Sequence, residues 1–161
     1  MKNWPWFLVS FLVIVADQVS KYWVLKTFTP YEPVSVLPMF NITLAYNTGS
    51  AFSFLSETGD WHRWFFTGFS IIMSGVLLVW MLRMPSCNKK QLLSLSLILG
   101  GAVGNVMDRI LLGHVIDFID VYYKTHHWPV FNVADSAICV GAMMLFFTLP
   151  ATSSHKKSAK L

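Results

Sequence analysis

The chain has 161 residues, of which 55% are hydrophobic and 12% charged, and its mean hydropathy is +0.54. Soluble domains carry about 25% charged residues, so this composition excludes an ordinary soluble fold. A bilayer removes the need for polar surface, and the length fits one membrane domain, residues 1–161, with short loops. The net charge of +4 does not indicate nucleic-acid binding, because the basic residues flank the apolar segments.

Four segments have the composition and length of membrane-spanning helices, which need roughly 17–25 residues. They run from about residue 4 to 25, 64 to 82, 91 to 110 and 132 to 150. The first is predicted to be a retained span, because no small-x-small cleavage site follows its apolar core. The expected fold class is an all-α integral membrane protein with four transmembrane helices, and residues 151–161 are expected to form a flexible basic tail.

Lysine and arginine are distributed unevenly between the two sides of this four-span topology. One side carries Lys2, the 83–90 loop and the tail, and it holds no Asp or Glu. All eight acidic residues fall in spans or on the opposite side. Since positively charged loops stay in the cytoplasm, both termini are expected to be cytoplasmic.

Two longer segments are expected on the non-cytoplasmic side, residues 26–63 and 111–131. Residues 40–46 partly alternate between apolar and polar side chains, which predicts a β-strand. Asn47-Thr48-Gly49 then predicts a turn. We therefore expect a small β-sheet platform that lies on the membrane surface on this side.

One group of polar side chains lies inside the first predicted span. Asp17, Ser20 and Lys21 occupy positions i, i+3 and i+4 and so share one helix face. Ionisable groups inside a membrane are costly, and they usually face a bundle interior or a wet cavity. The pattern fits either a structural ion pair between Asp17 and Lys21 or a role in an active site.

A second polar group, Asn105, Asp108 and Arg109, repeats this spacing at the end of the third span. Arg109 fits bidentate contact with a carboxylate, contact with a lipid phosphate, or an interfacial arginine that extends to water. The Gly100-xxx-Gly104 spacing just before them favours close helix packing.

Asp117 and Asp135 form the candidate catalytic pair. One closely follows the third span and the other begins the fourth, so both carboxylates can lie at one depth near the outer face. Two carboxyls that cannot both ionise share a proton, and one then activates water while the other protonates the substrate carbonyl. The alternative is two unrelated interfacial aspartates, one of which caps the fourth helix. Asp120 is expected to be a solvated loop acid.

Metal and serine chemistry are weaker alternatives. His114 and Asp117 supply at most two zinc ligands, and no HExxH motif or cysteine completes a site, so no metal is expected. Ser20 and Lys21 are adjacent, so their side chains diverge on a helix and do not form a Ser/Lys dyad.

Five stretches of the chain resemble, in the same order, the motifs of lipoprotein signal peptidases (signal peptidase II), the bacterial aspartic membrane proteases. They are Asp17-Gln-Val-Ser-Lys21, Asn47-Thr-Gly-Ser-Ala-Phe52, Gly104-Asn-Val-Met-Asp-Arg109, Gly113-His-Val-Ile-Asp-Phe118 and Phe131-Asn-Val-Ala-Asp135. The resemblance runs from end to end, across all four predicted spans.

This resemblance implies that Asp117 and Asp135 are the catalytic pair. It places further residues at the substrate site or in support of it: Asn47, Gly49, Asn105, Asp108, Arg109, Asn132, Asp17 and Lys21. The implied substrate is a bacterial prolipoprotein whose lipobox Cys carries a diacylglyceryl group, cut just before that Cys. The implied location is the inner membrane, with the active site near the periplasmic face. Membrane lipids are the other expected partners; no cofactor, metal or nucleic acid is expected, and the protein is expected to be monomeric.

Two other classes of function stay open on the residues alone. A proton-coupled transporter could also use intramembrane Asp and Arg, but it would be expected to show repeat symmetry or broken helices near the midplane, and the sequence has neither. A non-catalytic assembly factor would keep working after Asp117→Asn, whereas an aspartic protease would not.

Overall fold

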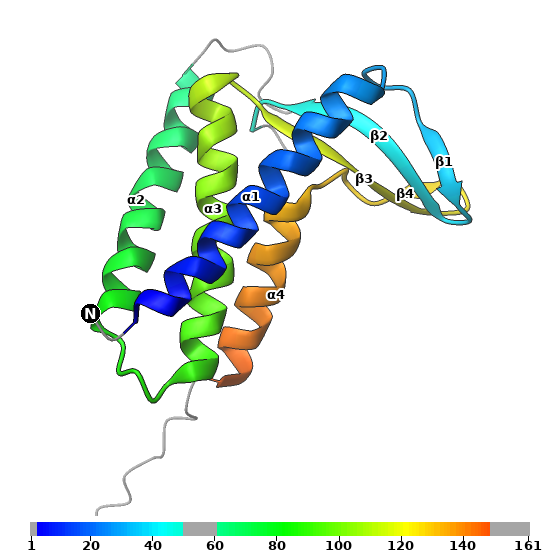
Figure 1. The fold of residues 1–161 in the computed structure, drawn as a ribbon. Coiled ribbons are helices and arrows are strands. Elements are labelled where there is room, and N and C mark those ends of the chain that lie inside the picture. Colours follow the sequence, from blue (N-terminus) through cyan, green and yellow to red (C-terminus); the bar gives the residue numbers. More distant parts are fainter. Residues whose placement is uncertain (1–2, 50–60, 149–161) are drawn as a thin grey trace, which may run out of the picture.

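The computed structural model describes residues 3–49 and 61–148. Helices make up most of this part of the chain, and Figure 1 shows them side by side, with a small sheet extending from one end. The helices are α1 (Trp4–Thr27), α2 (Trp61–Arg83), α3 (Lys89–Leu111) and α4 (Val133–Thr148). The strands are β1 (Val34–Leu37), β2 (Phe40–Asn47), β3 (Val115–Tyr123) and β4 (His126–His127).

The helices cover the four segments that the sequence predicts as spans. Three of them, α1, residues 64–83 of α2, and α3, are long and apolar enough to cross a membrane. The described part of α4 has 16 residues and is apolar but shorter. The last two residues of the fourth predicted span and the basic tail, 151–161, lie outside the described residues.

Local sequence explains where several helices begin and end. Pro5 lies in the first turn of α1, where its missing N–H costs no hydrogen bond. The same helix ends at Phe28, whose extended backbone (φ −115°, ψ 144°) leads toward the sheet. After α3, Gly113 has a φ of 85°, which a residue without a Cβ adopts readily, and this lets the chain turn directly into β3.

The sheet has four strands in the order β1-β2-β3-β4, with each neighbouring pair antiparallel. The predicted strand at residues 40–46 is confirmed as β2. β2 pairs with β3, with Ala45 opposite Asp117 and Asn41 opposite Asp120. The sequence did not indicate β3. This strand lies within residues 111–131, for which the sequence predicted no strand. Its first six residues, Val115 to Asp120, are all buried or half-buried, so this stretch shows no alternation between an apolar and a polar face.

α3 lies at the centre of the helix bundle and packs against α1, α2, α4 and β3. The Gly100-xxx-Gly104 spacing has the packing role that the sequence indicates. A Cβ atom at Gly100 would lie 2.7 Å from the carbonyl oxygen of Ser10, and one at Gly104 would lie 2.6 Å from Asp17 Oδ2. Only glycine at these positions lets α1 approach α3 this closely.

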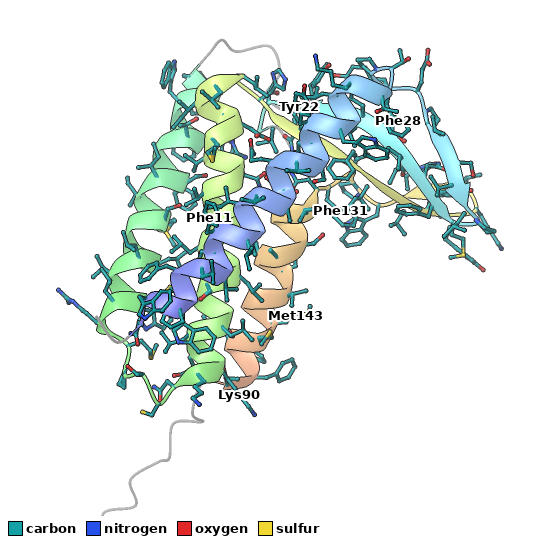
Figure 2. All side chains as sticks on the ribbon, in the orientation of Figure 1. Phe11, Tyr22, Phe28, Lys90, Phe131 and Met143 are labelled. Carbon is teal, nitrogen blue, oxygen red and sulfur yellow. The ribbon has the colours of Figure 1, made fainter. Side chains whose placement is uncertain are left out.

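A separate hydrophobic cluster joins the end of α1 to the sheet. It consists of Val24 from α1, Leu44 from β2, and Ile116 and Phe118 from β3, all buried. The outer faces of the helices, in contrast, carry exposed apolar side chains such as Phe11 on α1 and Met143 on α4 (Figure 2). Exposed apolar faces on long helices are what a lipid environment permits.

Candidate active site

Asp117 and Asp135 come from different elements and are joined by one side chain, that of Asn132. Asp117 lies on β3 and Asp135 in the first turn of α4. Nδ2 of Asn132 donates to Asp117 Oδ1 at 2.7 Å. Oδ1 of Asn132 accepts from the backbone N–H of Asp135 at 2.8 Å. The structure thus brings together the two residues predicted as a pair.

Asn132 and Asp135 also form a reciprocal cap at the start of α4. The backbone N–H of Asn132 donates to Asp135 Oδ2 at 3.3 Å, while the side chain of Asn132 receives the N–H of Asp135. This is the geometry of a capping box, with the acid at the third helical position. One part of the alternative to the catalytic pair, an aspartate that caps the fourth helix, is therefore found as well, and the cap fixes where the Asp135 carboxyl lies.

The second oxygen of Asp117 is held by the end of β2. Nδ2 of Asn47 donates to Asp117 Oδ2 at 2.9 Å, and Asn47 Oδ1 accepts from the backbone N–H of Gly49 at 2.8 Å. Gly49 has a φ of 101°, so the predicted turn at 47–49 needs its glycine. The rest of the stretch that resembles the family motif, residues 50–52, lies outside the described residues.

Burial of Asp117, which is 2% exposed, is the main influence on its acidity. Burial raises its pKa to about 6, and the nearby charge of Asp135 acts in the same direction. Hydrogen bonds from Asn47 and Asn132 and the charge of Lys21 lower the pKa in part. A carboxyl with this pKa is able to hold or release a proton close to neutral pH.

A buried polar network connects α1 to α3 beneath the aspartate pair. Lys21 Nζ lies 2.8 Å from Asp17 Oδ2 and 2.8 Å from Asp108 Oδ2, which confirms the predicted ion pair and adds a second partner. It also donates to Asn105 Oδ1 at 3.0 Å. Gln18, which sequence reasoning missed, donates to Asp108 Oδ1 at 2.9 Å. Its position inside the Asp17–Lys21 motif was the only signal for it.

The same network reaches the remaining elements of the site. Nδ2 of Asn105 donates to Asp135 Oδ1 at 2.8 Å. Asp17 Oδ1 accepts from the backbone N–H of Ala134 at 2.9 Å, and Asp108 Oδ2 accepts from that of Ile116 at 3.1 Å. Residues of α1, α3, β3 and α4 are thereby fixed relative to one another.

Arg109 has donor capacity that its neighbours do not use. Its Nη1 makes a long contact of 3.4 Å to the backbone oxygen of Asn105. Its Nε is buried and, among the described side chains, is the only buried nitrogen or oxygen without a hydrogen-bond partner. Asp135, Asp117 and Asp108 are all close enough to act on its charge. The guanidinium of Arg109 therefore lies near three carboxylates and keeps one buried N–H that no described residue accepts.

An apolar groove of about 510 Å³ begins at Asp135. It is lined by Trp128, Pro129, Val130, Phe131, Asp135, Ser136, Ile138 and Cys139. Figure 2 places Phe131 between the sheet and the start of α4. The groove therefore brings an apolar surface next to one carboxyl of the pair.

The prediction that Asp120 is a solvated loop acid is wrong. Asp120 lies on β3 and is 3% exposed. It accepts hydrogen bonds from Asn41 Nδ2 at 3.2 Å and Thr43 Oγ1 at 3.0 Å, and His127 Nδ1 lies 2.7 Å from it. Burial raises its pKa, but these hydrogen bonds outweigh burial and the pKa is lowered. Its partners are different from those of Asp117, because residues three apart on a strand point to opposite faces.

Comparison with known proteins identifies relatives along the whole chain. Residues 9–150 match the family model described as Signal peptidase (SPase) II. A lipoprotein signal peptidase from Cellvibrio japonicus is 49% identical over 157 residues, which cover 96% of this chain and 92% of the relative. One from Shewanella halifaxensis is 48% identical over 160 residues, covering 96% of this chain and 94% of the relative.

Solved structures agree with this assignment. A bacterial membrane enzyme determined by the in meso method at 2.3 Å resolution matches with a TM-score of 0.80 and 32% identity, covering 98% of this chain and 94% of that chain. A second, at 1.9 Å resolution, matches with a TM-score of 0.81 and 31% identity over 92% of this chain and 94% of that chain. The family model and the relatives cover nearly all of the chain, and the chain therefore belongs to the signal peptidase II family of bacterial membrane peptidases.

Proposed function

We propose that this protein removes signal peptides from bacterial prolipoproteins by aspartic-protease chemistry at Asp117 and Asp135. The observation that carries the proposal is the pairing of two carboxyls from different elements through the single side chain of Asn132. The relatives named lipoprotein signal peptidase supply the substrate class.

The proposed mechanism uses one proton shared by the aspartate pair. The ionised carboxylate removes a proton from a water molecule, and the water oxygen attacks the scissile carbonyl carbon. The protonated carboxyl gives its proton to the carbonyl oxygen. When the tetrahedral intermediate collapses, the C–N bond breaks and the leaving nitrogen takes a proton from the pair. The raised pKa of Asp117, about 6, supports a shared proton near neutral pH.

The groove beside Asp135 supports an apolar substrate. We assign it to the apolar part of a prolipoprotein that carries a diacylglyceryl-modified Cys, with cleavage just before that Cys. Arg109, whose buried Nε has no hydrogen-bond partner among residues 3–49 and 61–148, is assigned to a substrate oxygen. The described elements surround Asp117 and Asp135 with partners from one chain, which supports a monomer as the working unit.

The proposed orientation places the aspartate pair near the periplasmic face of the inner membrane, with both termini in the cytoplasm. The Lys-containing 83–90 loop and the sheet lie at opposite ends of the helices in Figure 1, and Figure 2 labels Lys90 at the end away from the sheet. The basic end is then cytoplasmic, and the sheet is periplasmic.

The decisive experiment measures signal-peptide release from a diacylglyceryl-modified prolipoprotein by the purified protein. Asp117→Asn and Asp135→Asn are each expected to remove nearly all turnover, and the double variant is expected to be hardly worse, because the two carboxyls act as one unit. Asp120→Asn is the matched control: it makes the same change on the same strand but outside the pair.

Two outcomes would contradict the proposal. Near-parental cleavage by Asp117→Asn or Asp135→Asn would exclude the aspartic mechanism and leave a non-catalytic role. A loss of activity in EDTA that zinc restores would point to metal chemistry, whereas two carboxyls and water require no metal.

A further inference from the structure

The three N–H donors of Lys21 are all engaged in the buried network. Its ammonium lies 2.8 Å from Asp17 Oδ2, 2.8 Å from Asp108 Oδ2 and 3.0 Å from Asn105 Oδ1. An ammonium group donates hydrogen bonds and accepts none. Its contact with Asn105 therefore requires the amide oxygen, and not the amide nitrogen, to face α1.

Asn132 imposes the same orientation on Asn105 from the opposite direction. Oδ1 of Asn132 accepts from the backbone N–H of Asp135, so the other end of its amide must be the Nδ2 donor. That Nδ2 lies 3.1 Å from Asn105 Oδ1. Two donors from different elements thus meet at the same oxygen.

The orientation of the Asn105 amide determines which of its atoms faces Asp135. With its oxygen held, Asn105 presents Nδ2 to Asp135 Oδ1 at 2.8 Å. With the amide reversed, two oxygens would face each other at this distance, which requires a proton between them. The orientation of one neutral amide therefore decides whether Asp135 Oδ1 meets a donor or an acceptor.

We infer that Lys21 is a positioning residue for Asp135 and acts through the orientation of the Asn105 amide. The inference rests on the proposed aspartic mechanism and assigns to Lys21 a role within it. An ion pair that only held α1 against α3 would need Asp17 and Asp108 but would not need the contact with Asn105. Lys21 itself does not contact either carboxyl of the pair in the hydrogen bonds described above.

Charged groups face Asp135 from several elements. Arg109 on α3 and Asp117 on β3 both act on it through their charge, and Lys21 on α1 acts on Asp117. Asn105 differs from these groups because it supplies a hydrogen-bond donor and no charge. An uncharged substitution such as Asn105→Ala therefore separates the effect of the donor from the effect of the surrounding charges.

A double-mutant cycle on kcat tests the inference. Removing Lys21 leaves Asp17 and Asp108 buried without a counter-charge, but this cost is common to both arms of the cycle, with and without Asn105, and cancels between them. Lys21→Met and Asn105→Ala are added separately and together. We expect Lys21→Met to lower kcat about tenfold or more when Asn105 is present and less than about twofold when it is absent, with KM nearly constant. If the double variant instead loses the product of the two single-variant losses in kcat, the inference is overturned.

Ser10→Ala is the matched control for packing between α1 and α3. Ser10 is buried on α1, and its Oγ donates to the backbone oxygen of Ser96 at 2.9 Å across the same interface. This variant is expected to lower the melting temperature, to leave kcat within about twofold, and to have the same effect with or without Asn105. If Ser10→Ala reproduces the pattern of Lys21→Met, the effect is one of packing and the inference fails.

A second arm uses the full-length parent with Asn105→Asp, which keeps an oxygen for Lys21 but replaces the donor at Asp135 with an acidic oxygen. The pH profile of kcat is expected to move upward by about one pH unit, because an added negative charge raises the pKa of neighbouring carboxyls. An unmoved profile would show that the side chain at position 105 does not act on the aspartate pair, and it would overturn the inference.

The parallel Asp117→Asn variant separates a failure of the proposed aspartic mechanism from a failure of the role inferred for Lys21. If it cleaves at a near-parental rate, the aspartic mechanism fails together with the role of Lys21. If it is inactive while the losses in the cycle multiply, the mechanism survives and the inference on Lys21 alone is overturned.

Discussion

The burial of Asp117, which supports its proposed catalytic role, also lowers the free energy of unfolding once its carboxyl is ionised. Burial raises its pKa from 3.8 to about 6, so the native state binds the proton more tightly than the unfolded state does. Stability is therefore lost as pH rises from about 4 to about 6, and the loss stays constant above that range. The gap between the two pKa values corresponds to about 3 kcal/mol at most.

Asp117→Asn is accordingly expected to inactivate the protein and yet to stabilise it at pH 8. The gain in the free energy of unfolding should be at most about 3 kcal/mol and should shrink as the pH falls from about 6 toward 4, because the native carboxyl of the parent then holds its proton. Thermal unfolding of parent and variant in the same detergent at several pH values measures it. An equal gain at pH 4 and pH 8 would contradict a buried ionised carboxyl as the cause.

The polar residues of the site differ in how far sequence alone reveals them. Charges inside apolar spans, such as Asp17 and Lys21, stand out because ionisable groups are rare there. The amides Asn47 and Asn132 carry no charge and follow no period, so only the resemblance to a family indicated them. Asp120 was misjudged because nothing in its neighbourhood showed that it lies on a strand, where Asn41, Thr43 and His127 bind it.

The strands illustrate the same limit for whole elements. β2 is visible in the sequence because its side chains partly alternate. β3 is not visible, because Val115 to Asp120 are buried or half-buried, and two aspartates interrupt its apolar run. The helices, in contrast, are predictable to within a few residues, because a long apolar segment has few other stable conformations in lipid.

Asp120 holds three strands together, and its removal is expected to weaken the sheet. Asn41 and Thr43 lie on β2 and His127 on β4, and all three bind its carboxylate. Asp120→Ala leaves the buried Asn41 without this partner and should reduce the free energy of unfolding by about 1–3 kcal/mol. His127→Ala should reduce it less, since the His127 side chain is 51% exposed. Thermal unfolding of both variants tests this ranking, and a larger effect from His127→Ala would refute it.

Close contact between α3 and α4 depends on glycine, and we expect this contact to be sensitive to a single methyl group. A Cβ atom at Gly101 would overlap the backbone oxygen of Ala134, one residue before Asp135. Gly101→Ala should therefore separate the two helices, lower the melting temperature and reduce kcat. Gly75→Ala on α2 is the control, because a Cβ there meets nothing within 4 Å and alanine favours helix by about 1 kcal/mol. Equal behaviour of the two variants would show that the helix contact is not limiting.

The molecule as a whole is polarised along its helices, with the basic loop at one end and the sheet at the other (Figure 1). Cys87 is exposed in the loop between α2 and α3. In a Cys139→Ala background, it should react with a membrane-impermeant maleimide in inverted inner-membrane vesicles and not in intact spheroplasts. Tyr31→Cys beside the sheet, combined with Cys87→Ser, should show the reverse, since Tyr31 is 64% exposed. The opposite labelling pattern would reverse the proposed orientation.

The central position of α3 has a consequence for how the protein is made. In its most apolar stretch, 61% of α3 is buried inside the protein, against 11% for α2. On its own in lipid, α3 would expose Asn105 and Asp108 to hydrocarbon, so its insertion gains from partners that are already in place. α1 is synthesised before α3, and its Asp17 and Lys21 pair with each other within one helix. This pairing neutralises both charges, so α1 can stay in the bilayer before α3 is inserted. The pair acquires Asp108 and Asn105 only when α3 arrives, and the backbone N–H of Ala134 only when α4 follows. A nascent chain is therefore expected to be inactive until its last helix has joined the bundle.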